Sequence, residues 1–289
     1  MKGKPKSQGL AKPGRPKSKE HRPSDRRQEA PFNRSGGDPR PRDAVPRAPV
    51  AAEHEFWIKS ESALDDYLKY SPKAVREVWL KGPSAKEKAG KLAEIIEVPI
   101  RVGEDESLWP VSDTPLAFKV ELRTRQEEEL WLRLDTHPPR CILALDHIQD
   151  PRNLGAIVRS AAFFGIREII VPSRRQVLIT DASVQTSQGG FALVQLYVIP
   201  NLVRSLEALK QKGFWVIGAD AEGRPLDARS FDFDRVVLVL GAEHKGLAPL
   251  VARTADALVA IQRSSSGFDS LNVSVACGIL LHELVRPRA

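Results

Sequence analysis

The sequence is poor in the features that mark secreted, membrane-spanning and disulfide-bonded proteins. It has two cysteines, Cys141 and Cys277, and both stand in apolar stretches. We expect them to be reduced core residues, because a disulfide framework or a structural metal site would need more cysteines at closer spacing. No hydrophobic run approaches the roughly 20 residues of a membrane span, and the basic N-terminus lacks the apolar middle of a signal peptide. These absences predict a cytoplasmic protein with no membrane contact and no metal site.

Large apolar residues are almost missing from the first 50 positions, which hold 9 of the 22 prolines. These positions carry 14 Lys and Arg against 5 Asp and Glu, a net charge of +9, whereas the other 239 carry 30 against 32, a net charge of −2. Such a segment cannot bury enough surface to offset the entropy lost on ordering, so residues 1–52 are predicted to be a disordered basic tail. Its charge suits non-specific attraction to nucleic-acid phosphates. A solubilising tail and a nuclear-localisation patch are the alternative interpretations.

The next part of the chain reads as a small α/β unit over residues 53–122, followed by a charged linker over residues 123–139 that ends in two prolines. Apolar spacing in the small unit predicts helices over 62–70 and 84–97, and strands over 75–80, 99–102 and 116–122. The acidic run at 127–129 is interpreted as a solvated helix face rather than a site.

From Cys141 onward, apolar strands alternate with helices. The continuous apolar run Cys141–Asp146 is typical of a strand buried on both faces of a parallel sheet. The pattern predicts strands over 141–146, 168–171, 193–199, 214–219, 235–240 and 257–261, and helices over 153–164, 181–189, 201–212 and after 270. Residues 140–289 are therefore expected to form a parallel α/β sheet covered by helices on both sides. We find no internal repeat.

Polar residues cluster in the loop that follows the first of these strands, over residues 146–159. Its Asn153 and Arg159 are six residues apart, so both reach the same end of the sheet only if the helix begins late. Gly155 permits a close approach of the backbone. An Arg in such a place favours bidentate binding of phosphate or carboxylate. For an isolated Arg, a surface salt bridge is the plainer interpretation.

A second cluster, residues 241–247, follows another apolar strand directly. Gly241 and Gly246 permit a tight turn with exposed backbone, and Glu243 lies between them. Ligands of open α/β sheets bind just outside such strand ends. Taken alone, Gly-x-Glu-x-x-Gly is a weak signal.

The third cluster, residues 270–276, opens the last helix, and Ser270 or Asn272 suits its N-cap. This helix has two apolar stripes, Leu271/Val275/Ile279 and Val273/Ala276/Leu280/Leu284. It is therefore expected to be buried on most of its circumference, by the core or by a second subunit. A capped core helix after a serine-rich linker is the plainer interpretation.

Taken in this order, the three clusters resemble the SpoU (TrmH-like) family of RNA ribose 2′-O-methyltransferases, within the SPOUT class. The family's marks are Asn-x-Gly-x-x-x-Arg, Gly-x-Glu-x-x-Gly and Ser-Leu-Asn-Val-Ser-Val-Ala, and all three stand intact here within residues 140–286. Residues 53–122 resemble more loosely the family's small ribosomal-protein-like substrate-binding domain. Residues 114–118 replace the His-Gln-Gly segment of many relatives, and residues 262–266 depart from the usual lead into the third motif.

The resemblance implies a parallel sheet with a C-terminal trefoil knot and a homodimer formed through the last helix. It also implies methyl transfer from S-adenosylmethionine to the 2′-hydroxyl of a ribose in structured RNA, with rRNA the first expectation and tRNA the second. By position, the implied cofactor-binding residues are Gly218, Gly241, Ile261, Leu271 and Ser274. The implied catalytic residues are Arg159, Asn153, Glu243, Asn272 and Ser270.

The resemblance also gives these catalytic residues separate roles. In the family, the Arg that matches Arg159 is proposed to ease loss of the hydroxyl proton, aided by an RNA phosphate. Because a guanidinium does not readily lose a proton, the alternative role is to orient the phosphate and stabilise the developing alkoxide. Asn153 and Asn272 would position Arg159 and the ribose, and Glu243 would hold that network. Ser270 and Ser274 would fix the loop over the cofactor. Four arginines, Arg152, Arg174, Arg175 and Arg263, are further candidates for contacts with RNA phosphates.

Two other classes of function fit parts of the pattern. A non-catalytic RNA-binding relative would share the fold, but it would be expected to lack Arg159, Asn272 or Glu243, and all three are present. A nicotinamide-dependent dehydrogenase would need Gly-x-Gly-x-x-Gly after the first strand. The first strand here leads into Asp-Pro-Arg-Asn instead.

Overall fold

The computed structural model describes residues 53–103, 109–110, 114–226, 234–243, 245–262 and 270–285. The predicted tail, residues 1–52, lies outside the described residues. Among the described helices, none combines the length and the apolar character that a membrane crossing requires.

The small unit is a four-stranded sheet with the order β1-β4-β2-β3. β4 pairs antiparallel with β1 and β2, and β2 pairs parallel with β3. Its strands are β1 (His54–Ile58), β2 (Val75–Leu80), β3 (Ile100–Val102) and β4 (Leu116–Leu122), and its helices are α1 (Glu61–Tyr70), α2 (Ala85–Ala93) and the short 3-10 turn η1 (Pro72–Ala74). The predicted helices and strands are present, and β1 is an additional strand that the apolar pattern did not indicate.

Helix α1 shows why this segment folds as it does. The side chain of Ser60 accepts a hydrogen bond from the amide of Ala63 at 3.2 Å, which satisfies one of the free amides of the first turn. Leu64 and Tyr67 are buried, and the Tyr67 ring meets that of Phe118 on β4 edge to face. The helix is therefore capped at its start and held to the sheet by one apolar stripe.

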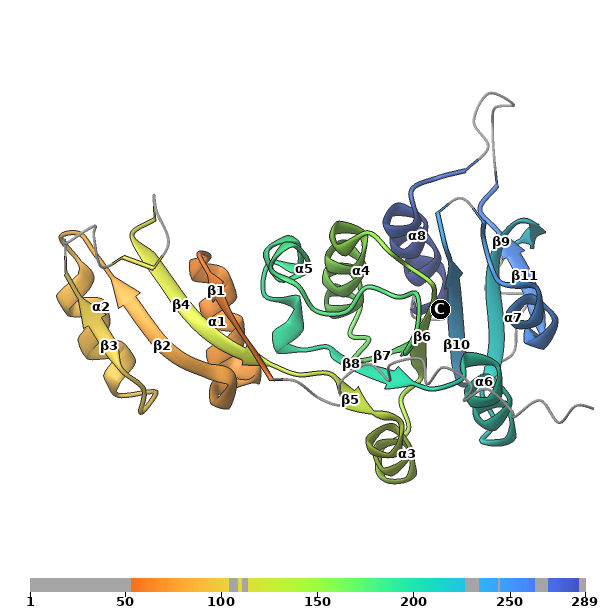
Figure 1. Ribbon diagram of the computed structural model, residues 1–289, viewed down its shortest axis with the longest axis horizontal. Helices are drawn as coiled ribbons and strands as arrows, with labels where there is room; N and C mark the ends of the chain where they lie inside the picture. The colour runs from red at the N-terminus through yellow and green to blue at the C-terminus, as the bar shows by residue number, and fades with distance from the viewer. Residues whose placement is uncertain are drawn as a thin grey trace, which may run out of the picture. The chain divides into compact units, whose positions relative to one another are not determined.

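The larger unit is a seven-stranded sheet with the order β11-β9-β10-β6-β7-β8-β5, and every pairing in it is parallel. Its strands are β5 (Arg125–Gln126), β6 (Cys141–Asp146), β7 (Glu168–Pro172), β8 (Gln195–Ile199), β9 (Trp215–Pro225), β10 (Val236–Gly241) and β11 (Ala257–Ala260). Every residue of β6 and β10 is buried, as a central strand with both faces covered requires. The predicted parallel α/β sheet is confirmed (Figure 1).

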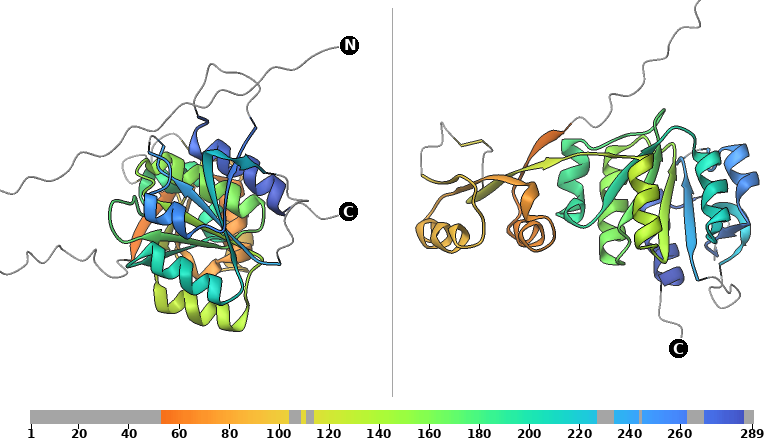
Figure 2. Two further views of the ribbon diagram at one scale, coloured as in Figure 1. Left: turned by 90° about the vertical axis from the view of Figure 1, so that its right-hand side faces the viewer. Right: turned by 90° about the horizontal axis from the view of Figure 1, so that it is seen from below.

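Helices pack on both faces of this sheet (Figure 2). One face is covered by α4 (Pro151–Phe163), α5 (Asp181–Ser187) and α8 (Val273–Val285), and the 3-10 turn η3 (Gly190–Ala192) follows α5. The other face is covered by α3 (Glu127–Thr136), α6 (Leu202–Gln211) and α7 (Pro249–Thr254). Alternate residues of β6 divide between the two faces: Leu143 and Leu145 pack with the first set of helices, Ile142 and Ala144 with the second.

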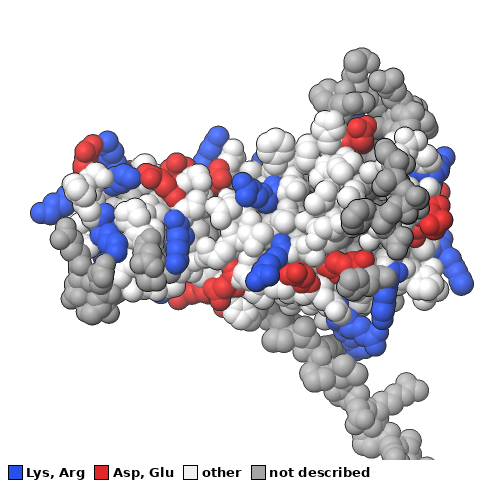
Figure 3. All heavy atoms as spheres, turned by 90° about the horizontal axis from the view of Figure 1, so that it is seen from above, with Lys and Arg blue, Asp and Glu red and all other residues white. Residues whose placement is uncertain are grey.

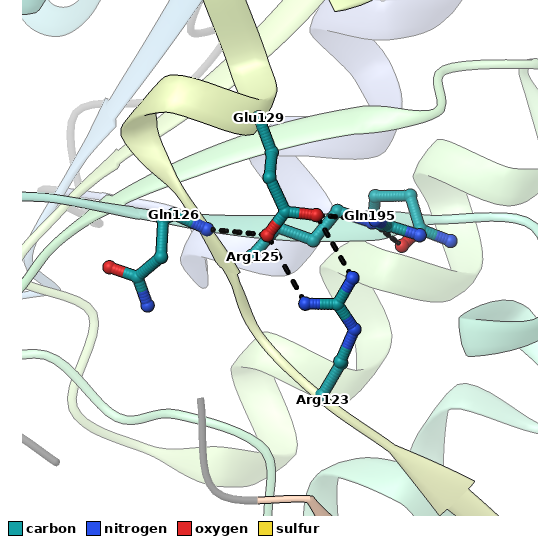
Figure 4. A network of polar contacts seen from close by, with 5 residues as sticks. All are labelled: Arg123, Arg125, Gln126, Glu129 and Gln195. Atoms are coloured by element: carbon teal, nitrogen blue, oxygen red, sulfur yellow. Dashed lines mark hydrogen bonds and ion pairs between the residues drawn. The ribbon is translucent and has the colours of Figure 1, made fainter. Parts of the chain in front are cut away.

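The segment that was expected to be a linker, residues 123–139, is part of the larger unit instead. β5 adds to the edge of the sheet beside β8, and α3 buries Leu130 and Leu134 against its face. The carboxylate of Glu129 organises the turn between them (Figure 4). It accepts two hydrogen bonds from Arg123, at 3.2 and 2.9 Å, one from Arg125 at 2.7 Å, and one from the amide of Gln126 at 3.2 Å. The acidic run therefore begins a packed helix, and Glu129 holds the turn before that helix together through four hydrogen bonds.

The two sheets lie within one compact unit of the chain and are joined by specific contacts. The side-chain amide of Gln185 on α5 donates to the carbonyl of Trp57 on β1 at 2.6 Å, and the hydroxyl of Ser71 donates to the carbonyl of Ala192 at 2.7 Å. A Cβ added at Gly189, whose φ is +90°, would lie 3.0 Å from Cα of Ala63 on α1. Only a glycine allows α1 to approach the α5–η3 turn this closely.

Candidate active site

The neighbouring strands β6 and β10 end side by side, because Asp146 and Gly241 are paired in register. Asp146 is 1% exposed, and its carboxylate accepts a hydrogen bond from the amide of Ala248 at 2.6 Å and lies 2.5 Å from Nδ1 of His147. This buried carboxylate fastens the loop after β10 to the end of β6. The loop is thus held at the carboxyl edge of the sheet, where ligands of such folds bind.

The loop after β10 is a tight turn closed by its own backbone. Ala242 and Gly246 exchange two amide–carbonyl hydrogen bonds, at 3.0 and 2.9 Å, and Gly246 has a φ of +62°. A Cβ added at Gly241 would lie 2.2 Å from the carbonyl carbon of Gly246, so no larger residue fits without moving the turn. Both glycines of the second motif are required by this geometry, and Glu243 is presented between them.

Side chains from all three sequence clusters meet beside this turn in one hydrogen-bonded chain. The hydroxyl of Ser274 donates to Oδ1 of Asn272 at 2.6 Å, and Nδ2 of Asn272 donates to Oδ1 of Asn153 at 3.0 Å. Nδ2 of Asn153 then donates to Oε1 of Glu243 at 2.7 Å. Each member donates to the next, and the chain ends on a carboxylate. The structure therefore brings together three of the predicted catalytic residues, from positions up to 119 residues apart.

Asn272 also starts the last helix. Its Oδ1 accepts from the amide of Ser274 at 2.9 Å, and its carbonyl accepts from the amide of Ala276 at 2.9 Å. Asn272, rather than Ser270, is thus the residue that caps α8. Because one side chain caps the helix and bonds Asn153, the start of α8 is fixed relative to α4.

A pocket of about 800 Å³ opens at this edge of the sheet, and we call it the strand-end pocket. It is lined by the ends of β9, β10 and β11, the turn after β10 and the start of α8. Five of the predicted residues line it: Gly241, Glu243, Ile261, Ser270 and Leu271. Its size falls within the range of small-ligand sites, and residues at the ends of three strands contribute to its lining.

Two predicted cofactor residues lie elsewhere. A Cβ added at Gly218 would lie 2.7 Å from a methyl group of Leu247 and 2.8 Å from one of Leu258, so this glycine serves packing beneath the pocket. Ser274 does not line the pocket; it holds Asn272, as described above. The charged lining residues Asp220, Glu222 and Lys245 were not foreseen. β9 continues to Pro225, beyond its predicted end at 219, and so carries the two acids to the pocket.

Gly155 serves packing as well, because a Cβ there would lie 2.5 Å from the carbonyl oxygen of Ser183 on α5. Arg159 stands apart from the hydrogen-bonded chain. Helix α4 begins at Pro151, with Asp150 accepting from the amide of Arg152 at 2.7 Å, so Asn153 is already in its first turn. Six residues advance a helix by about 9 Å and leave side chains about 120° apart around its axis. The condition that the helix begins late is therefore not met within one chain.

Arg159 instead lines a second pocket, of about 360 Å³, between α1, α4 and the α5–η3 turn. We call it the interhelical pocket. Of the other candidate arginines, Arg152, Arg174 and Arg175 are exposed, and Arg263 lies outside the described residues.

The two apolar stripes of α8 differ sharply in burial. Val273, Leu280 and Leu284 are buried with Cys277 against the core, whereas Leu271, Val275 and Ile279 are 51%, 50% and 40% exposed. Burial raises the pKa of the Cys141 thiol to about 12, and it raises the pKa of Cys277 as well, so both thiols are the core residues that were expected. The exposed stripe is a contiguous apolar surface with no covering among the described residues.

Comparison with known proteins places this site in context. The sequence pattern of the SpoU rRNA Methylase family matches residues 140–282. An uncharacterized tRNA/rRNA methyltransferase of Mycobacterium avium (strain 104) is 42% identical over 151 residues, which are 52% of this chain and 48% of that protein. A homologue of the same description from Mycobacterium ulcerans (strain Agy99) is 42% identical over 155 residues, 54% of this chain and 49% of its own length. The chain thus spans about half the length of the curated relatives it matches.

Two crystal structures share the fold over most of the chain. The SpoU methyltransferase AviRb from Streptomyces viridochromogenes has a TM-score of 0.65 at 23% identity, covering 80% of this chain and 89% of that one. An AdoMet-bound rRNA methyltransferase from Sinorhizobium meliloti has a TM-score of 0.63 at 25% identity, covering 80% of this chain and 87% of that one.

Proposed function

Residues 140–282 of this chain belong to the SpoU rRNA methylase family, and from that premise we propose that the protein transfers a methyl group from S-adenosylmethionine to a ribose 2′-hydroxyl of RNA. The observation that carries the proposal is the hydrogen-bonded chain from Asn272 through Asn153 to Glu243, which reaches the strand-end pocket through Glu243. Three polar side chains from three separated motifs converge where a cofactor and a ribose could meet.

The strand-end pocket fits the proposed cofactor. The turn after β10 can approach a ligand closely because Gly241 has no side chain, and Ile261 and Leu271 give the pocket apolar lining. Asp220 and Glu222 are acceptors suited to the ribose hydroxyls and the positive charges of S-adenosylmethionine. The Sinorhizobium meliloti relative is described as AdoMet-bound, which supports the assignment. When bound, the cofactor would supply an electrophilic methyl group on a sulfonium, a leaving group that needs no metal.

The protein's own residues would align the ribose and ease loss of its proton. Asn153 has both ends of its amide engaged, so its orientation is fixed and one N–H remains for a substrate oxygen. Glu243 keeps a second carboxylate oxygen, Oε2, that can accept from a ribose hydroxyl. Such fixed groups would orient the ribose hydroxyl for attack on the methyl group, and alignment is the main requirement of a displacement reaction.

Arg159 would bind an RNA phosphate and stabilise the developing alkoxide. Within one chain it lies in the interhelical pocket, away from Glu243. We propose that a second copy packs on the exposed stripe of Leu271, Val275 and Ile279, because α8 packs on α4, the helix that carries Arg159. A homodimer would cover the stripe and bring a second α4 beside the site.

We propose that the segment from β9 to α8 forms the trefoil knot of the family, that residues 53–122 bind the RNA, and that the basic tail aids encounter in the cytoplasm. On the face drawn in Figure 3, basic and acidic side chains alternate, so the described body presents no continuous basic surface there. We propose rRNA as the substrate first and tRNA second.

The test is incubation of the purified protein with radiolabelled S-adenosylmethionine and total RNA, followed by mapping of 2′-O-methyl positions. We expect label in one RNA species, at a nucleotide that resists alkaline cleavage on its 3′ side. Glu243→Gln should lower incorporation about 100-fold. Label on a base rather than a ribose would refute the 2′-O assignment, and no label in any RNA would refute the activity.

A further inference from the structure

The interhelical pocket has polar and aromatic side chains facing one space. Helix α1 contributes Ser62, Asp66 and Tyr70, which recur every four residues and so share one face. Helix α4 contributes Arg159 and Phe163, also four residues apart. Gln188 comes from the turn between α5 and η3. A cavity of about 360 Å³ with this lining is large enough for one nucleobase and its sugar.

The pocket is fixed by close packing beneath it. Gly189 lets the α5–η3 turn pack directly against Ala63 of α1. Gly189 also lies beside Asp66, because a Cβ added at this glycine would be 3.3 Å from Oδ2 of Asp66. Gln188 has φ 49° and ψ 48°, a left-handed conformation that is unfavourable for a residue with a side chain. Gln188 is the C-cap residue of α5, where helices commonly end in this conformation, and it fixes the turn that lines the pocket.

The two charged groups that line the pocket are not paired with each other. Asp66 and Arg159 both line the cavity, and no ion pair within 4.0 Å joins the two among the described contacts. The carboxylate only accepts hydrogen bonds, and the guanidinium only donates them. A ligand that satisfies both must offer a donor edge to one and an anionic group to the other.

The aromatic residues add a third requirement. Phe163 is 83% exposed and Tyr70 is 41% exposed, so two aromatic surfaces border a polar cavity from opposite helices. Protein sites for single-stranded RNA use this combination: bases stack on aromatic rings, and their Watson–Crick edges are read by polar side chains.

We propose that the interhelical pocket receives an unstacked guanosine of the RNA, with the base beside Phe163 and Tyr70, its edge on Asp66 and a flanking phosphate on Arg159. Guanine is the base that offers two adjacent donors, N1–H and the 2-amino group, to one carboxylate; adenine offers an acceptor at N1. The inference rests on the proposed function in one respect only, that the ligand is RNA. It names the nucleotide selected, which need not be the one methylated.

The experiment measures binding rather than methyl transfer, so that it can fail independently of the proposed activity. Three fluorescein-labelled RNA hairpins of one sequence would carry G, A or inosine once in an otherwise all-uridine loop, and fluorescence anisotropy would give Kd for the full chain. We expect the G hairpin to bind about tenfold more tightly than the A hairpin, with inosine between them because it lacks the 2-amino group.

Variants assign the effect to the pocket. Asp66→Asn should reduce the preference for G over A to about twofold or less, and Phe163→Ala should weaken binding of all three hairpins about tenfold, since stacking is insensitive to the base. Asp65→Asn is the matched control, because Asp65 is an exposed neighbour on α1 outside the pocket.

Circular dichroism melting of each variant would separate loss of binding from loss of folding. Unchanged preference in a folded Asp66→Asn protein would overturn the inference, as would equal affinity of the wild type for G and A. If base preference is lost in Asp66→Asn while no RNA is methylated in the assay above, the proposed activity fails and the binding site stands.

Discussion

The strand-end pocket and the interhelical pocket are lined by different kinds of structure, and this difference determines how each should respond to mutation. The strand-end pocket is lined by strand ends and a glycine turn, and Glu243 in its lining is held by hydrogen bonds that run through Asn153 to Asn272. The interhelical pocket is lined by side chains of exposed helix faces, with charges not engaged with each other. Substitutions should therefore destroy the first pocket by displacing backbone, and retune the second by removing single contacts.

The largest effect that follows from this comparison is expected at Gly241. A Cβ there would lie 2.2 Å from the carbonyl carbon of Gly246, so Gly241→Ala must shift the turn that lines the strand-end pocket. We expect the Kd for S-adenosylmethionine to rise about 100-fold or more by isothermal titration calorimetry. Gly90→Ala, on α2 with nothing within 4 Å of an added Cβ, is the control and should bind normally. A Kd within threefold of the wild type would contradict the idea that the turn shapes the cofactor site.

Substitution of Arg159, a residue of the interhelical pocket, should remove only the contacts of its own side chain and leave the strand-end pocket intact. Arg159→Ala is expected to lower single-turnover methylation about 100-fold or more, the size of a lost transition-state contact. Cofactor affinity should not change, because Arg159 does not line the strand-end pocket. Stopped-flow or quenched-flow methylation, with Arg204→Ala on the opposite face of the sheet as the control, would measure this. Near-normal turnover would refute the role of Arg159.

Mixed dimers would show which pocket Arg159 serves. If it acts across the proposed dimer interface, a heterodimer of Arg159→Ala and Glu243→Gln chains has one pocket with both residues intact. Co-refolding the two variants should then restore about a quarter of wild-type turnover, from half the dimers with one working site each. If sedimentation shows that the mixture contains dimers and turnover is still not restored, Arg159 and Glu243 of the same chain must act in one site.

The sequence could predict the strand-end pocket far better than the interhelical one, for a physical reason. Buried parallel strands such as β6 are continuous apolar runs, so their ends, and the glycine turn after β10, are visible as patterns. Convergence of Asn153, Glu243 and Asn272 follows, because carboxyl ends of parallel strands meet at one edge.

Features that depend on helix phase and on packing between units could not be read in this way. The start of α4 at Pro151 rather than Asn153 turns Arg159 away from the strand ends. The charged segment before β6 has the sequence pattern of a linker, because only two of its residues, Leu130 and Leu134, are buried in the core. The capping contact of Glu129 forms only in the folded turn. β1 and α7 are short elements whose positions tertiary contacts determine.

The exposed stripe of α8 gives a test of intermediate size. Ile279→Glu would place a charge in the proposed dimer interface, where it would lose solvation without a partner. We expect the dimer dissociation constant to rise about 30-fold or more by analytical ultracentrifugation. Leu132→Glu changes a 69% exposed residue on α3, on the other face of the sheet, and should not alter association. A wild type that stays monomeric at 100 times the assay concentration would remove the homodimer from the proposal.

The smallest effect is expected at Glu129, which lies in neither pocket but fixes β5 and α3 to the larger sheet (Figure 4). Despite the opposing effect of partial burial, hydrogen bonds from Arg123, the Gln126 amide and Arg125 hold the pKa of this carboxyl below its usual value. Its stabilising contribution is therefore present at neutral pH and is lost as pH falls through that lowered pKa. Glu129→Gln should reduce the free energy of unfolding in urea by about 1 kcal/mol at pH 7.

The same difference between Glu129→Gln and wild type should shrink toward zero as the carboxyl becomes protonated in acid, because the wild type then loses the charge that the variant never had. Glu128→Gln, exposed in the same turn, controls for loss of one negative charge near the helix start and should change stability by no more than a few tenths of a kcal/mol. Cofactor affinity should be the same in all three proteins, because no residue of this junction lines the strand-end pocket. A fall in cofactor affinity in folded Glu129→Gln would show that the strand-end pocket depends on the sheet edge at β5, and would contradict the view that the two regions are independent.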